Sequence, residues 1–264
     1  MKVYMMTDLE GVAGVVSFLS QTYPEGRYYD AAKQLLTEEI NAAIEGLLKA
    51  DVDDVLVVDG HGPGAVCFEQ LHPAAKLLHG RPLAPIRSWD PIVREYDVCM
   101  MIGQHAMTGA AKGNLNHTQD SRAIDSIKLN GKPIGEIAQV ALYQGAMGIP
   151  LIFLSGDQAA CKEAESLVPG ITTVCVKTGL GRNSAISVSA AQSRALIREG
   201  AELAINHHRD SPVVPLVWPG PFVIEKRFFQ TDAADQCGAL PDAQRLDDQT
   251  VRFESDDVQD IIYR

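Results

Sequence analysis

The sequence lacks the cysteine patterns that mark disulfide-rich proteins and thiolate metal sites. Its five cysteines are odd in number and scattered, and none of them forms a C-x-x-C pair. Several lie in apolar runs, where cysteine behaves as a small hydrophobe. A disulfide framework and a thiolate zinc site are therefore not expected. No apolar run is long enough to span a membrane, and the first residues carry no signal-like pattern, so we expect a cytoplasmic protein with no membrane partner.

An excess of basic residues is also missing. Lys and Arg total 23 against 34 Asp and Glu, which gives a formal net charge of −11, and no Lys/Arg cluster stands out. Because nucleic-acid binding needs a basic face, nucleic acid is not an expected partner. The chain does have 264 residues with 46% hydrophobic content, enough for a large core in one α/β domain, alone or with a small lobe.

Apolar runs of strand length alternate with amphipathic segments over the first 210 residues. The expected strands are 3–6, 52–58, 98–103, 150–154 and 172–176; the expected helices are 31–50, 136–147, 158–167 and 189–208; a hairpin turns at Asn130-Gly131. After residue 211 the pattern changes to proline-rich loop and short strands. We predict an α/β fold with a mixed, mostly parallel sheet covered by helices on both faces in residues 1–210. Residues 211–264 would form a smaller C-terminal α+β lobe.

The first strand ends in an unusual acidic turn, Asp8-Leu9-Glu10-Gly11. Residues two apart in extended chain point the same way, so Asp8 and Glu10 would present their carboxylates to one side. Two neighbouring carboxylates at the end of a core strand repel each other unless a cation lies between them. The alternative is a turn in which Asp8 accepts backbone amide hydrogen bonds and Glu10 stays in solvent. This short motif alone does not decide between the two.

Two further predicted strands end in histidines. His61 follows the second strand within a Gly/Pro-rich loop, and His105 follows the third. In α/β sheets, sites lie outside the carboxyl ends of the strands, so these histidines would meet Asp8 and Glu10. Such nitrogen and oxygen ligands suit a zinc-class ion. The alternatives are an exposed turn for His61 and a buried hydrogen-bond partner for His105.

Three other residues lie near the same predicted edge, and spacing leaves their roles open. Glu136 begins a helix, where a carboxylate is also favoured by the helix dipole. His117 lies in the loop after His105 and could be a ligand, an acid/base group or simply exposed. Asp157 follows the fourth strand and is expected to cap a helix.

In these residues the sequence resembles the DppA-type D-aminopeptidases, a zinc metallopeptidase family whose founding member acts on D-amino-acid peptides. The resemblance covers residues 1–205 and rests on these segments in order: Asp8-Leu9-Glu10-Gly11, Asp59-Gly60-His61, Gly103-Gln104-His105-Ala106, Asn116-His117-Thr118, Gly135-Glu136, Ser155-Gly156-Asp157, Val176-Lys177-Thr178-Gly179 and Arg182-Asn183-Ser184-Ala185. The C-terminal lobe looks poorly matched.

The resemblance implies an α/β fold, two zinc ions per subunit and a ring-based decamer that encloses the active sites. Asp8 would bridge the two ions. Glu10 and His61 would complete one site, and His105 and Glu136 the other. His117 would be a catalytic group that is not a ligand. Mn²⁺ and Co²⁺ are alternatives to zinc, because such ligand sets accept several ions.

The expected function is therefore a di-metal aminopeptidase that removes the N-terminal residue of short peptides, D-amino-acid peptides among them. Two ions sharing a carboxylate lower the pKa of a water between them, and His117 would transfer protons or stabilise the oxyanion. One rival is another di-metal hydrolase such as a phosphoesterase, for which Lys177 and Arg182 offer the only hint. A second rival is a non-enzymatic small-molecule-binding protein.

Overall fold

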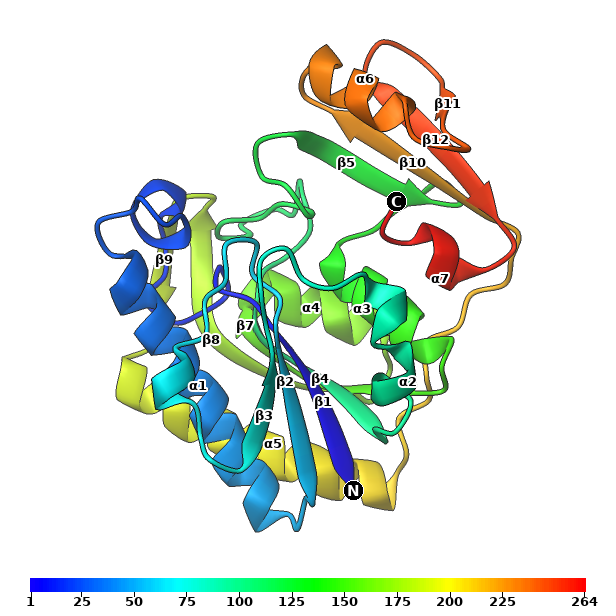
Figure 1. The fold of residues 1–264 in the computed structure, drawn as a ribbon. Coiled ribbons are helices and arrows are strands. Elements are labelled where there is room, and N and C mark those ends of the chain that lie inside the picture. The colour runs from blue at the N-terminus through cyan, green and yellow to red at the C-terminus, as the bar shows by residue number, and fades with distance from the viewer.

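The computed structural model describes residues 1–264 and contains two sheets (Figure 1). The larger sheet has seven strands, all parallel except the last pair, β8 and β9. This mixed, mostly parallel arrangement confirms the predicted fold class. In sheet order the strands are β3 (Ala75–Leu78), β2 (Asp54–Asp59), β1 (Lys2–Thr7), β4 (Val98–Gln104), β7 (Leu151–Asp157), β8 (Thr172–Gly181) and β9 (Ser184–Ser187).

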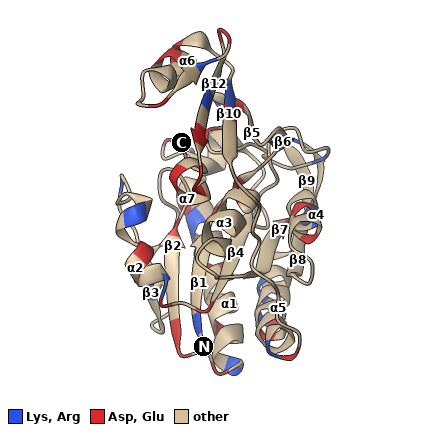
Figure 2. Ribbon diagram, turned by 90° about the vertical axis from the view of Figure 1, so that its right-hand side faces the viewer, with Lys and Arg blue, Asp and Glu red and all other residues tan.

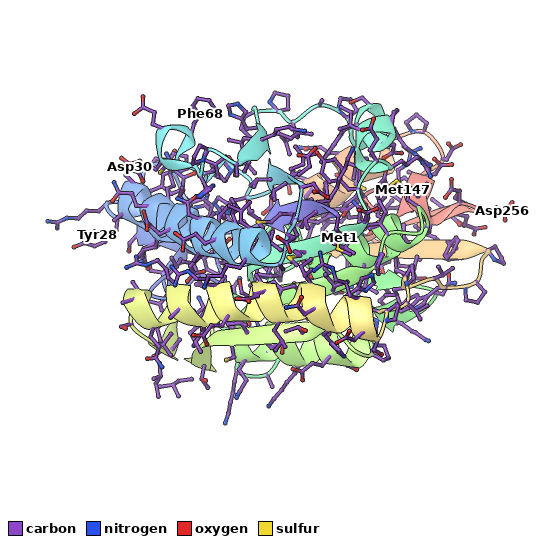
Figure 3. All side chains as sticks on the ribbon, turned by 90° about the horizontal axis from the view of Figure 1, so that it is seen from below. Met1, Tyr28, Asp30, Phe68, Met147 and Asp256 are labelled. Carbon is purple, nitrogen blue, oxygen red and sulfur yellow. The ribbon has the colours of Figure 1, made fainter.

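Helices cover both faces of the larger sheet. On one face α1 (Tyr29–Lys49) and α5 (Ala190–Asp210) run side by side, as Figure 3 shows from below. They pack closely because Gly46 has no side chain: a Cβ there would lie 2.1 Å from the carbonyl oxygen of Arg198. The other face carries α3 (Glu136–Gly145) and α4 (Gln158–Leu167).

The second sheet is smaller and antiparallel, in the order β11-β12-β10-β5-β6. It combines the predicted hairpin with the C-terminal strands, since Leu129 pairs with Ile224. The smaller sheet therefore takes strands from both sides of residue 210, and the two-domain division at that residue remains a prediction. Its elements are β5 (Ile124–Leu129), β6 (Lys132–Pro133), β10 (Phe222–Phe228), β11 (Gln244–Arg245), β12 (Thr250–Ser255), α6 (Thr231–Gly238) and α7 (Val258–Ile261).

Helix α3 lies between two hydrophobic cores. Its residues Ile137 and Val140 belong to the large core under the parallel sheet, whereas Leu142 and Tyr143 belong to the smaller core of the second sheet. A helix that is apolar on all sides must be buried, and nine of the ten residues of α3 are. Its one partly exposed residue is Glu136, which opens the helix and is therefore held firmly in place.

The central strand β1 pairs in parallel with β2 on one side and β4 on the other. The carboxyl ends of all three strands consequently meet at one edge of the sheet, on the side facing the second sheet (Figure 1). A short helix, α2 (Asp90–Val93), precedes β4. Figure 2 shows acidic and basic segments interspersed along the elements. None of the helices combines the length and apolar character required to cross a lipid bilayer.

Candidate metal centre

The structure brings all five predicted ligands together at the ends of the three central strands. Asp8 and Glu10 follow β1, His61 follows β2, and His105 follows β4. The first residue of α3, Glu136, completes the group. The first four side chains are buried, although each is polar or charged. Burial of so many such groups is costly unless they are paired or hold a cation.

The two carboxylate oxygens of Asp8 face different histidines. Oδ1 lies 3.2 Å from His61 Nδ1, and Oδ2 lies 3.0 Å from His105 Nε2. Each histidine also faces a second carboxylate: Glu10 Oε2 lies 3.0 Å from His61 Nδ1, and Glu136 Oε1 lies 3.4 Å from His105 Nε2. The five side chains thus divide into two groups that share Asp8.

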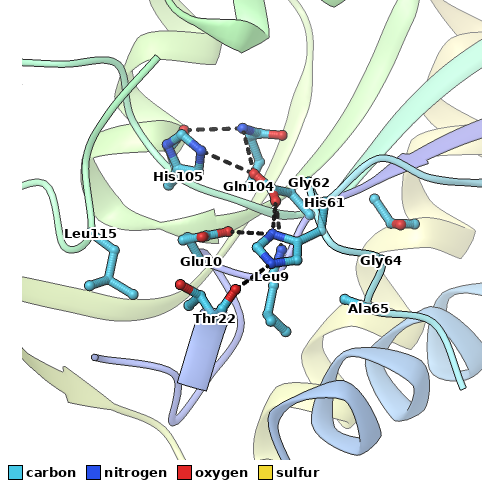
Figure 4. Close-up of polar contacts among 12 residues, drawn as sticks. Leu9, Glu10, Thr22, His61, Gly62, Gly64, Ala65, Gln104, His105 and Leu115 are labelled. Atoms are coloured by element: carbon cyan, nitrogen blue, oxygen red, sulfur yellow. Dashed lines mark hydrogen bonds and ion pairs between the residues drawn. The ribbon is translucent and has the colours of Figure 1, made fainter. Parts of the chain in front are cut away.

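Backbone carbonyls fix the orientation of both imidazoles. His61 Nε2 lies 2.8 Å from the carbonyl oxygen of Thr22, and His105 Nδ1 lies 2.9 Å from that of Ala106. A carbonyl only accepts hydrogen bonds, so each of these nitrogens carries a proton. With a metal bound, the other nitrogen of each ring would be deprotonated and would present its lone pair to the ion, as in metal-ligating histidines. Figure 4 shows Glu10 and Thr22 contacting the His61 ring.

The carboxylates favour positive charge on both histidines. Burial alone would lower the pKa of His61, but Glu10 and Asp8 outweigh it and raise that pKa well above its usual value. The pKa of His105 is likewise raised, against burial, by Glu136 and Asp8. Glu10 Oε2 and His105 Nε2 are buried without a properly directed hydrogen bond. A divalent cation that accepts N and O ligands fits both unsatisfied atoms.

His117 lies against the same site. Its ring stacks on that of His105, and its Nδ1 lies 2.9 Å from the carbonyl oxygen of Leu115. One atom each of His105, His117 and Glu136 lie within 4.8 Å of one another, as do atoms of Asp8, Glu10 and His105. Burial, then the charge on His105, lowers the pKa of His117. The structure therefore leaves His117 able to act as a ligand or as a neutral proton acceptor.

Close backbone contacts hold the strand ends together. Gly103 has φ of +75°, a left-handed conformation that favours glycine, and a Cβ there would lie 2.1 Å from the carbonyl oxygen of Asp8. Lys177 is fully buried beside this turn, where its ammonium donates to the carbonyl oxygens of Glu10 and Val15. Burial lowers the pKa of Lys177 to about 8. These two hydrogen bonds from Lys177 hold the backbone of the turn at Glu10 in place.

Other residues of the site gave no signal in the sequence. Thr22 contributes only a backbone carbonyl. Gln119 has φ of +64°, and its amide N–H donates to Glu136 Oε1 at 2.7 Å. The side-chain oxygen of Gln119 accepts a hydrogen bond from Lys226 on β10 at 2.8 Å, which links the second sheet to Glu136. Asp157 has the predicted role, because its side chain accepts a hydrogen bond from the Ala160 amide at the start of α4.

A polar cavity of about 430 Å³ opens above the ligands. Asp8, Glu10, His61 and Glu136 line it together with His117. Arg122 lies over the ring of Tyr23, 3.9 Å from the ring centroid, and both residues border the same cavity. The site is thus accessible to a small polar substrate from this side.

Comparisons with known proteins agree with this architecture. A family model described as D-aminopeptidase matches residues 1–263. A D-aminopeptidase of Bacillus subtilis (strain 168) is 28% identical over 264 residues, which cover 98% of this chain and 93% of that protein. The solved structure of the Zn-dependent D-aminopeptidase DppA from Bacillus subtilis, described as a self-compartmentalizing protease, matches with a TM-score of 0.89 at 26% identity. The match covers 100% of this chain and 94% of that one.

These matches define an α/β metallopeptidase. The chain belongs to the D-aminopeptidase family, whose model extends to residue 263. The resemblance drawn from residues 1–205 is therefore confirmed, as is the prediction of an enzyme of this class. The expectation of a poorly matched C-terminal lobe is wrong, because the family match spans that lobe.

Proposed function

We propose that this chain is a di-zinc aminopeptidase that releases the N-terminal residue of short peptides. Asp8 would bridge the two ions, with Glu10 and His61 completing one ligand set and His105 and Glu136 the other. The observation that carries the proposal is the division of the Asp8 carboxylate, whose two oxygens face His61 and His105 at 3.2 and 3.0 Å. Zinc dependence of the DppA structure supports the choice of metal.

Bound zinc would supply Lewis acidity and a water of lowered pKa at this site. His117 would take the proton released in the reaction. Its Nδ1 donates to the Leu115 carbonyl, so Nε2 of the neutral ring has a free lone pair. Because burial lowers the pKa of His117, the ring is neutral near pH 7 and can act as a general base. This tautomer favours proton transfer over donation to an oxyanion.

An aminopeptidase must also hold the α-amino group of its substrate, and carboxylates near the metal centre could do so. Three carboxylates, those of Asp8, Glu10 and Glu136, border the polar cavity, which Asp120 also lines. Two zinc ions would balance the charge of these four carboxylates, so the substrate amine would be held by direct contact with a carboxylate such as Asp120, which is not a proposed ligand, and not by net charge. The family name supports D-amino-acid peptides as substrates.

We further propose that the chain assembles into a homo-oligomer, by resemblance a decamer. The description of the DppA structure as a self-compartmentalizing protease supports assembly. A cytoplasmic location is also proposed, supported by five cysteines that are all free in the structure. Light scattering of the purified protein would measure the assembly directly, and a monomeric mass would refute it.

The catalytic proposal is tested with zinc-reconstituted protein and paired D- and L-aminoacyl anilides. N-acetylated substrates serve as controls, because an aminopeptidase needs the free amine, and a phosphate ester tests the phosphoesterase alternative. We expect turnover of free-amine substrates alone. Turnover of the phosphate ester alone would favour that rival, and tight ligand binding without any turnover would favour a binding protein.

The metal sites are tested by elemental analysis of variants. Asp8→Ala should lower bound zinc from about two ions per subunit towards zero, because both ligand sets share this carboxylate. Glu10→Ala should weaken only one site, and Glu136→Ala only the other. The proposal would be contradicted if the wild-type protein binds no transition metal and its activity does not change when a chelator is added.

A further inference from the structure

A second cavity adjoins the proposed metal centre and differs from the first in chemistry. It has a volume of about 250 Å³ and shares Asp8, Gly60, Gln119 and Glu136 with the polar cavity. Eight of its fifteen lining residues are hydrophobic, against one of thirteen in the polar cavity. Its apolar wall includes Met6, Leu83, Ile86, Trp89, Met101 and Val140. The bridging carboxylate Asp8 therefore stands at the junction of an apolar and a polar chamber.

A substrate cleaved at this junction must place one residue on each side of the scissile bond. The polar chamber carries Arg122, whose guanidinium suits the carboxylate of a short leaving peptide. The apolar chamber carries Gln139, which is fully buried on α3. Its Nε2 donates to the Ile262 carbonyl at 2.8 Å, and its Oε1 has no hydrogen-bond partner.

We propose that the apolar chamber receives the side chain of the N-terminal residue, so that the enzyme prefers large apolar residues at that position. This specificity rests on the aminopeptidase function proposed above. The volume suits the assignment, because an apolar protein cavity of about 150 Å³ already holds benzene. A chamber of about 250 Å³ accepts leucine or phenylalanine side chains and leaves an alanine methyl group poorly packed.

A larger apolar cavity elsewhere is the competing location. It has a volume of about 460 Å³ and is lined by Met107, Ala111 and Leu167 among others. None of the five proposed ligands borders it. A side chain placed there would leave the scissile carbonyl away from Asp8, so this cavity does not serve the reaction at the metal centre.

The kinetic test uses variants in which a larger side chain fills the apolar chamber. Leu83 lines the apolar chamber from a loop and is partly exposed, so Leu83→Trp adds a larger side chain to the chamber wall. We expect kcat/KM for leucyl relative to alanyl anilide, measured with the faster enantiomer, to fall by about tenfold or more. Ile86→Trp is the second variant if the first does not fold. Ala111→Trp in the competing cavity is the control and should leave the ratio unchanged.

A binding test is independent of turnover and of metal. Trp89 and Trp218 are the only tryptophans, so the emission of a Trp218→Phe variant reports on the chamber wall. The probe is 3-methylbutylamine, which has the side chain of leucine and no scissile bond, with ethylamine as control. We expect the first amine alone to shift the Trp89 emission, in both zinc-loaded and metal-free protein.

The outcomes separate the two proposals. An unchanged leucyl-to-alanyl ratio in both filled variants, with normal wild-type turnover, would overturn the specificity and leave the aminopeptidase intact. A ratio changed by Ala111→Trp instead would move the specificity site to the larger cavity. Absence of turnover of every aminoacyl substrate by zinc-loaded wild type would reject the function, and the specificity with it.

Discussion

The imidazole rings of His105 and His117 stack with their centroids 3.9 Å apart and 17° between their planes. The edge of Phe18 meets the His117 ring at a centroid distance of 5.5 Å. Because Nδ1 of His117 also donates a hydrogen bond to the Leu115 carbonyl, the His117 ring has little freedom to rotate. A proposed catalytic base is thus held in a fixed position beside a proposed metal ligand, as proton transfer in a preorganised site requires.

Replacing His117 tests this arrangement. We expect His117→Ala to keep both zinc ions and to lose about 10²–10⁴-fold in kcat/KM, the usual contribution of a general base. Elemental analysis and anilide kinetics on the same preparation measure the two effects. Loss of one zinc ion would instead make His117 a ligand beside His105 and Glu136, which lie close enough for that role.

Much of this site could be predicted from the sequence because it depends on strand ends. Asp8, His61 and His105 each follow an apolar strand, and strands of a parallel sheet end at a common edge. That argument succeeds because β1 pairs with both β2 and β4. The same reasoning does not decide the role of Glu136, because Glu136 begins a helix whose position depends on the two cores that meet around α3.

What could not be predicted depends on tertiary contacts without a local pattern. No local pattern indicates that the strand Ile124–Leu129 pairs with β10, because the paired residues lie about 100 positions apart in sequence. The edge strand Ala75–Leu78 is only four residues long and follows Pro73, so it reads as irregular chain. The Thr22 carbonyl and the left-handed Gln119 act through backbone geometry that side-chain identity does not reveal.

Zinc binding should release protons. In the metal-free protein the carboxylates raise the pKa of both His61 and His105 well above its usual value, so both rings are protonated at pH 7. A metal binds only the neutral ring, so about two protons should leave per subunit, one from each histidine. Calorimetric titration with zinc in buffers of different ionisation enthalpy measures this number. Binding heats that do not depend on the buffer would contradict the protonated state.

The close contact at Gly103 should make this position intolerant of any side chain. Gly103→Ala combines a φ of +75° with a Cβ 2.1 Å from the Asp8 carbonyl oxygen, so we expect a loss of about 3 kcal/mol or more in the free energy of unfolding. Gly109 is a matched control, because it has φ of +79° and no atom within 4 Å of its Cβ position. Gly109→Ala should cost only about 1 kcal/mol. Equal losses in urea unfolding would show that backbone strain, not contact, dominates.

Lys226 should give the protein a stability that rises with pH. Burial lowers the pKa of Lys226 to about 8, against about 10.4 for an unfolded lysine. Between these values the folded protein has released the proton and the unfolded chain still holds it, so raising the pH favours the folded state. Relative to Lys226→Met, the wild type should gain about 1.4 kcal/mol per pH unit from pH 8 to 10.4. Urea unfolding of both proteins across this range measures the difference, with Lys128→Met, at an exposed position on the neighbouring strand β5, as the control. A difference between wild type and Lys226→Met that is constant with pH would show that Lys226 keeps its charge when it donates to Gln119.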